Sequence, residues 1–194
     1  SKPKKISSEH FMVIDSSTKL NLELEKSTTG NRKFSLLSVL DQTATSCGAR
    51  LLNLYLNMPL ADVSSINKRL DSVEFFVNES GVLQKVRAAL LHYPEVERAL
   101  ARICMGKGEL RDLAAIRSGL RVSFTVAELL TFCGEDLPSN VRVAVSNLAG
   151  FAGLDTILEA SLREEIPQLL KNGNFIKEGC NAELDSLYEL KSYA

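Results

Sequence analysis

The chain has 194 residues, of which 45% are hydrophobic and 24% charged, and its 23 Lys and Arg residues nearly balance its 24 Asp and Glu residues. This composition is typical of a soluble globular domain and excludes a wholly disordered chain. The formal net charge of −1 argues against a dedicated nucleic-acid-binding domain, which normally carries a basic excess. No apolar run approaches the ~18 residues of a membrane span, so we expect no membrane partner.

The first predicted elements are two short β strands near the N-terminus. Residues 11–14 form a short apolar run, and residues 21–25 alternate Leu22 and Leu24 with polar residues, as a half-buried strand does. The polar stretch 27–33 that follows is typical of a loop.

Helical patterns then dominate the chain. The apolar segment 51–56 predicts a helix that ends before Pro59, because a proline disfavours helical geometry in the residue before it. Asp62 is a plausible N-cap for the next helix. That helix carries apolar residues at spacings of 3, 4, 3 and 4, namely Val63, Ile66, Leu70, Val73 and Val77.

Three further stripes predict helices after Pro94, which separates them from the helix before it. They are Val96, Ala99, Leu100 and Ile103; Leu110, Leu113, Ile116 and Leu120; and Val141, Ala144, Val145 and Leu148, closed by Gly150.

The last predicted elements are a turn, a short strand and a helix. Asn172-Gly173 is a turn signal before the apolar pair Phe175-Ile176, and Asn181 is a reasonable N-cap for a helix over residues 182–194. The chain is therefore predicted to be mainly α, a multi-helix domain with short β strands near the N-terminus and before the last helix.

The cysteines and histidines do not form a recognisable metal or disulfide pattern. Cys47, Cys104, Cys133 and Cys180 are widely spaced without a CxxC pair, and only two histidines occur. We interpret the four cysteines as free thiols in a reducing cytosol. The basic opening Ser1-Lys2-Pro3-Lys4-Lys5 precedes no apolar stretch of signal-peptide length, so neither secretion nor import is expected.

Motifs for catalysis are also missing. Gly106-Lys107-Gly108 imitates a phosphate-binding P-loop, but Ala101 stands at the first glycine and Gly108 at the hydroxyl position, so we interpret it as a turn between helices. Cys104 and His92 lack a third orienting group, and His92 fits better as a cation at a helix end. Glu164-Glu165 is interpreted as a solvated helical face. No catalytic, cofactor-binding or metal-binding residue is assigned.

Several short blocks follow one another in an order typical of one protein family. The early blocks are Asp15-x-x-Thr18-x-x-Asn21-Leu22-Glu23-Leu24, Ser35 to Thr45, Gly48-Ala49-Arg50-Leu51-Leu52, Pro59-Leu60 and Ile66 to Glu74. The later ones are Glu97-Arg98, Arg111-Asp112-Leu113 and residues 179–187 around Ala182-Glu183-Leu184-Asp185. Together they resemble the core, or lever, domain of the MutS family of DNA mismatch-repair ATPases, over nearly the whole chain. The sequence departs from the family at Cys47, Tyr55, Glu95 and Cys180, where Met, Trp, Asp and Tyr are usual.

The resemblance implies a division of the chain and a role. Residues 1–14 would enter from the connector side, residues 15–178 would form the first part of the core domain, and residues 179–194 would start the lever helix leading to the DNA clamp. The implied role is a non-catalytic lever that couples ATP state to DNA clamping and mismatch recognition in the parent protein.

The same resemblance implies what the parent protein binds. ATP and Mg would belong to an ATPase domain outside this chain, and no cofactor is expected within it. The implied partners are mismatched double-stranded DNA, a second copy of the parent as a homodimer, and downstream mismatch-repair proteins. We expect a cytoplasmic, bacterial location.

Two other functions are compatible with the sequence. A free-standing helical module that binds a partner protein is one alternative, and a small hydrolase built on Cys104 and His92 is another.

The leucine-rich helix over 51–56 is predicted to lie centrally in a core. Arg50, next to these leucines, is predicted to be buried or half-buried beside a partner, and Arg69 and Arg98 are interpreted as structural ion-pairing residues rather than DNA contacts.

Overall fold

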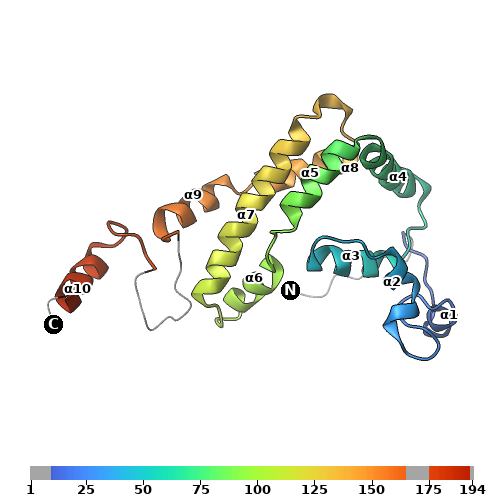
Figure 1. The fold of residues 1–194 in the computed structure, drawn as a ribbon, viewed down its shortest axis with the longest axis horizontal. Helices are drawn as coiled ribbons and strands as arrows, with labels where there is room; N and C mark the ends of the chain where they lie inside the picture. Colours follow the sequence, from blue (N-terminus) through green and yellow to red (C-terminus); the bar gives the residue numbers. More distant parts are fainter. Residues whose placement is uncertain (1–9, 165–174, 193–194) are drawn as a thin grey trace. The chain divides into compact units, whose positions relative to one another are not determined.

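The computed structural model describes residues 10–164 and 175–192, and these residues are mainly helical (Figure 1). They divide into two compact units, of which unit 1 comprises residues up to His92 with Glu128–Val145, and unit 2 comprises Tyr93–Ala127 with the residues from Ser146 onward. The α helices are α1 Ser16–Asn21, α2 Leu36–Leu40, α3 Ser46–Asn57, α4 Val63–Asn78, α5 Ser80–Leu90, α6 Val96–Cys104, α7 Leu110–Thr131, α8 Ser139–Ala149, α9 Ala152–Ser161 and α10 Ala182–Ser192; the 3-10 turns are η1 Arg32–Phe34 and η2 Gly134–Asp136.

The predicted β strands are wrong for the described residues. Phe11 makes only an isolated bridge with Leu60, and Leu162 makes another with Ile176. The stretch 21–25 is instead the end of α1 and a turn, with Glu23 at a φ of +50°. Asp15 explains the difference, because its carboxylate accepts hydrogen bonds from the amides of Ser17 and Thr18 and so starts a helix. The predicted Asn172-Gly173 turn lies outside the described residues.

The predicted helices and their caps are confirmed within the described residues, where the helix predicted over 182–194 is seen as far as Ser192. Asp62 caps α4 by accepting a hydrogen bond of 2.8 Å from the amide of Ser65. Asn181 caps α10 through the amides of Glu183 and Leu184, at 3.0 and 3.1 Å. Local capping chemistry therefore fixed both helix starts, independently of what the helices pack against.

Unit 1 is built on α3, α4, α5 and the segment that leaves α7. Its buried apolar side chains are Val86 of α5, Leu130 of α7, Leu137 between η2 and α8, Val141 of α8, and Leu24 from the N-terminal turn. The prediction that α3 is central is wrong, since α3 has no buried residue and Leu51 and Leu54 are exposed. The α4 stripe is also largely exposed, at Val63, Leu70, Val73 and Val77.

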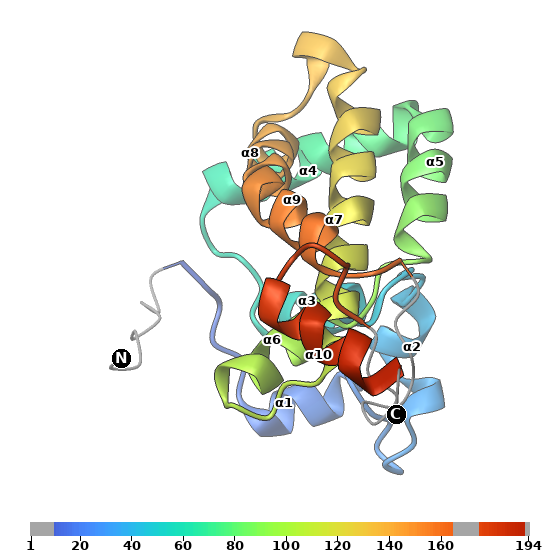
Figure 2. The same ribbon diagram turned by 90° about the vertical axis from the view of Figure 1, so that its left-hand side faces the viewer.

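Unit 2 packs α6 and α9 with the first part of α7 (Figure 2). A close approach at Gly119 sets the packing of α7, because a Cβ built there would lie 2.3 Å from Cγ2 of Val96 at the start of α6. Only glycine leaves room for this contact. The buried apolar side chains of the unit are Ala99, Val126, Ala127, Leu158 and Leu162.

One stretch, Ser139–Ser161, is long and apolar enough to cross a membrane by length and composition alone. It is not one continuous helix, because α8 ends at Ala149 and α9 begins at Ala152.

Candidate functional site

The most elaborate polar arrangement in unit 2 is centred on Arg117, in the middle of α7. Its side chain is only 4% exposed. Nη1 donates hydrogen bonds to the carbonyl oxygens of Leu162 and Arg163 at 3.3 and 2.8 Å, and Nη2 donates to that of Glu164 at 2.9 Å. One buried guanidinium therefore holds three successive carbonyls just beyond the end of α9.

Arg121 lies one helical turn further along α7, on the same face as Arg117. Its Nη1 and Nη2 donate to the two carboxylate oxygens of Glu164 at 2.7 and 3.1 Å, while its Nε donates to Glu159 Oε1 at 2.8 Å. The guanidinium lowers the pKa of the Glu164 carboxyl, and the two carboxylates raise the pKa of Arg121. Both shifts favour the charged, paired state at neutral pH.

Residues 175–177, which precede α10, also form hydrogen bonds with the end of α9 and the residues just after it. The amide of Lys177 donates to the carbonyl of Ser161 at 2.9 Å, and the amide of Arg163 donates to that of Phe175 at 3.0 Å. The ammonium of Lys177 also donates to the carbonyl of Glu159. We call Arg117, Arg121, Glu159, Glu164 and Lys177 the α7 joint.

The α7 joint ties together elements that lie far apart in the sequence. It links the middle of α7 to the end of α9 and to residues 175–177, which precede α10. Arginine suits this work, because its rigid planar fork binds carboxylates and carbonyls through several parallel hydrogen bonds. The interactions of the α7 joint are hydrogen bonds and ion pairs among its own side chains and the backbone at the end of α9.

A second ion pair fixes the start of α7. Asp112 is only 1% exposed. Its Oδ1 accepts a hydrogen bond of 2.9 Å from Nε of Arg102 in α6, and its Oδ2 accepts one of 2.9 Å from the backbone amide of Glu109. The second bond is the reach-back half of a capping box. These hydrogen bonds, that from Arg102 first, lower the pKa of Asp112 from 3.8 to about 2.

The arginines predicted to be structural have three different environments. Arg50 is exposed, so the prediction of burial is wrong, and the reason is that α3 lies at the surface of unit 1. Arg69 of α4 stacks its guanidinium 3.7 Å from the centre of the Tyr55 ring, a cation–π contact between α4 and α3 rather than the expected ion pair. Arg98 pairs with Glu95 at 3.5 Å, on the surface.

The two sequence features that resemble catalytic motifs, the tripeptide at residues 106–108 and the Cys104/His92 pair, do not form a catalytic arrangement in the structure. Gly106 has a φ of +68°, and Gly106-Lys107-Gly108 forms the predicted turn between α6 and α7. Cys104 and His92 are both exposed, Cys104 in unit 2 and His92 at the edge of unit 1. Neither lies in an enclosed site of the kind that activates a nucleophile. Within the described ranges, no three His, Cys, Asp or Glu side chains are grouped as metal ligands would be.

Sequence reasoning missed the α7 joint. It interpreted Glu164 as part of a solvated helical face; Glu164 is indeed exposed, but it is not helical, because α9 ends at Ser161, and it pairs with Arg121. Glu165 lies outside the described residues. The sequence did contain a signal for buried ion pairing in α7, because Arg117 and Arg121, four residues apart, interrupt its largely apolar sequence.

Comparison with known proteins places the chain. A family model described as MutS domain III matches residues 17–192. The chain is 41% identical to the DNA mismatch repair protein MutS of Rhizobium meliloti (strain 1021) over 190 residues, which is 97% of the chain and 20% of that relative. It is 40% identical to that of Dinoroseobacter shibae over 98% of the chain and 21% of the relative, and 40% identical to that of Zymomonas mobilis over 91% and 20%. The chain thus spans about a fifth of the length of these relatives.

Proposed function

The chain belongs to the MutS family, as its domain III, and we propose that it acts as the non-catalytic lever of a DNA mismatch-repair protein. In this role it couples ATP state to DNA clamping and mismatch recognition. The lever would need to keep its shape while force passes through it, and two rigid arrangements of such a body are the usual basis of long-range coupling.

The α7 joint is the observation that carries this proposal. It ties α7, a helix of 22 residues, to the end of α9, and residues 175–177, which precede α10, hydrogen-bond to that same end of α9. A displacement of α7 would therefore be passed to residues 175–177 through hydrogen bonds rather than absorbed by a loose loop. Long helices with buried ties are suited to transmit a displacement over distance.

The proposal assigns the chemistry to other parts of a longer protein. ATP and Mg²⁺ would bind in an ATPase domain that is separate from this chain, and mismatched double-stranded DNA, a second copy and downstream repair proteins would be partners of the parent protein. The bacterial relatives support a cytoplasmic setting.

The proposed output arm is α10. Its start is held by the Asn181 cap and by the amide of Gly179, which donates to Asp185 at 2.9 Å. Further along, Leu184 and Tyr188 are half-buried, but Leu187 is 57% exposed. A helix of 11 residues is marginal alone in water. We propose that its exposed side packs on the rest of the lever in the parent protein.

A proline in α10 tests this role. Leu187→Pro would break the helix at its middle, at a cost of about 3 kcal/mol, and in the parent protein should spare ATP binding while slowing ATP-triggered release from a mismatched duplex. Ala182→Pro is the matched control, because proline is tolerated at the first position of a helix. Unchanged release in a folded Leu187→Pro protein would show that α10 does not transmit the signal.

A further inference from the structure

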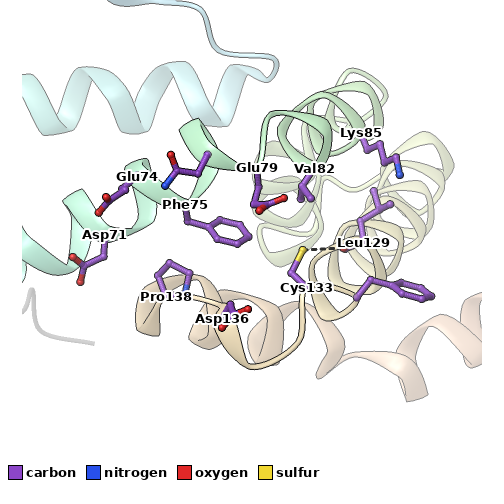
Figure 3. Close-up of a pocket in the computed structure, with 12 residues that line it drawn as sticks. Asp71, Glu74, Phe75, Glu79, Val82, Lys85, Leu129, Cys133, Asp136 and Pro138 are labelled. Carbon is purple, nitrogen blue, oxygen red and sulfur yellow. Dashed lines mark hydrogen bonds between the residues drawn. The ribbon is translucent and has the colours of Figure 1, made fainter.

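Unit 1 contains a groove that the lever role does not use (Figure 3). It lies between α4 and α5 on one side and the end of α7, η2 and the start of α8 on the other, and its volume is about 960 Å³. That volume is at the upper end of the range for sites that enclose a small molecule, and this groove is open to solvent.

The floor of the groove is apolar. It is formed by half-buried side chains from all three segments, namely Phe75, Val82, Leu129, Cys133 and Pro138. Phe132 stands at the edge with 92% of its surface exposed. A phenylalanine so fully in water buries very little apolar surface within unit 1, whereas exposed aromatic side chains beside a groove are typical anchors of protein interfaces.

The rim of the groove is acidic. Four of the lining residues are exposed carboxylates, Asp71, Glu74, Glu79 and Asp136, and Lys85 is the one cation among the lining residues. They come from separate elements and do not form a group that could hold a metal ion. The rim therefore carries three net negative charges above an apolar floor, which repels nucleic acid and attracts a cationic partner.

We propose that this groove binds a basic amphipathic helix from another protein, with its apolar face on Phe75, Val82 and Phe132 and its Lys or Arg side chains facing the acidic rim. Charge complementarity selects the partner, since an acidic or neutral helix would leave the four carboxylates without compensation. A helix lying in a groove is an established mode of recognition, in which apolar residues at i, i+3, i+4 and i+7 enter the groove. This inference is independent of the lever role.

The test uses a synthetic helix of about 14 residues made of leucine and lysine, with the leucines on one face. Two control peptides carry glutamate in place of lysine, or the same residues in an order without an apolar face. Binding to the 194-residue chain is measured by calorimetry at low and high salt. The basic helix should bind one to one and more weakly at high salt, and the control peptides should not bind.

Variants locate the binding. Glu79→Gln combined with Asp136→Asn should weaken binding about threefold to tenfold, because exposed charge pairs contribute modestly. Phe132→Ala should weaken it about tenfold or more, as loss of an aromatic anchor does. The matched control is Asp41→Asn combined with Glu183→Gln, which removes two exposed carboxylates outside the groove and should leave binding unchanged.

The half-buried thiol of Cys133 reports occupancy directly, with exposed Cys104 and Cys180 as internal references. Bound peptide should slow labelling of Cys133 about tenfold or more, while leaving the two references unchanged. Equal binding of the acidic peptide, binding without protection of Cys133, or protection of Cys133 by self-association of the chain alone would each overturn the proposal.

Discussion

At the scale of single residues, Arg117 shows that the hydrogen-bond partners of a buried charge cannot be predicted from the sequence. Sequence reasoning expected a buried or half-buried guanidinium at Arg50, amid leucines, but Arg50 is exposed and the arginine buried among the described residues is Arg117. Its ligands are backbone carbonyls 45 to 47 residues away, and a carbonyl is present at every position of every sequence. No pattern of side chains could therefore identify them, although burial of a charge always requires such partners.

Asp112 makes the stability of the chain depend on pH. Its pKa is about 2 in the folded chain, below 3.8 for an unperturbed group, so the folded state binds a proton less readily than the unfolded state. The stabilisation is complete above about pH 4 and is lost as pH falls toward 2. We predict that Asp112→Asn lowers stability at pH 7 and makes its decline between pH 4 and 2 shallower, as measured by urea unfolding.

The control for this measurement is Asp71→Asn, which changes an exposed carboxylate of α4. The stability of this variant should fall with pH in parallel with that of the unmodified chain. Part of the acid decline should remain in Asp112→Asn, because the pKa values of Asp15, Asp41, Asp62 and Glu164 are also lowered in the folded chain. Identical slopes for Asp112→Asn and the unmodified chain would contradict the assignment.

At the scale of elements, local signals were sufficient for helices and insufficient for their packing. Asp62 and Asn181 marked helix starts correctly, because a cap is decided by residues within three positions of it. The alternating residues 21–25 were misassigned, since the competing Asp15 cap lies just upstream. The α4 stripe has the period of a buried face but is mostly exposed, and periodicity alone does not say what covers a face.

Two glycines in helices should respond in opposite ways to the same change. Gly119→Ala places a methyl group 2.3 Å from the stiff Val96 side chain, which must shift, so we predict a loss of about 1–3 kcal/mol in the free energy of unfolding. Gly153→Ala meets nothing within 4 Å, so the gain in helix propensity should stabilise the chain by about 0.5–1 kcal/mol. Denaturant unfolding of both variants checks the signs, and stabilisation by Gly119→Ala would refute the close approach of α6 and α7.

At the scale of the whole chain, the structure leaves many large apolar side chains in water. They lie on α3, α4, α9 and α10, among other elements, and include Leu54, Val73, Ile157 and Leu190. The chain matches about a fifth of the length of its relatives. Both facts agree with a part that works inside a larger protein, and the sequence indicated this through its ordered family blocks rather than through any active site.

The chain alone should bind DNA poorly. Its net charge of −1 supplies little of the phosphate neutralisation that drives sequence-independent binding, and residues 155–194 are predominantly acidic. We predict weak, strongly salt-dependent binding of duplex DNA with no preference for a mismatch, measured by fluorescence anisotropy. Nanomolar binding at physiological salt, or tighter binding to a mismatched duplex, would contradict a purely mechanical role.

The coupling role is tested most directly by ATP-triggered release of a mismatched duplex from the parent protein carrying Arg121→Gln. This change removes the ion pairs of the α7 joint with Glu159 and Glu164, whereas Arg98→Gln, the control, removes a surface pair. We predict that Arg121→Gln slows release by about 2- to 30-fold with ATP binding unchanged, and that Arg98→Gln does neither. Release at the parental rate from folded Arg121→Gln protein would contradict the proposal that the α7 joint couples nucleotide state to DNA.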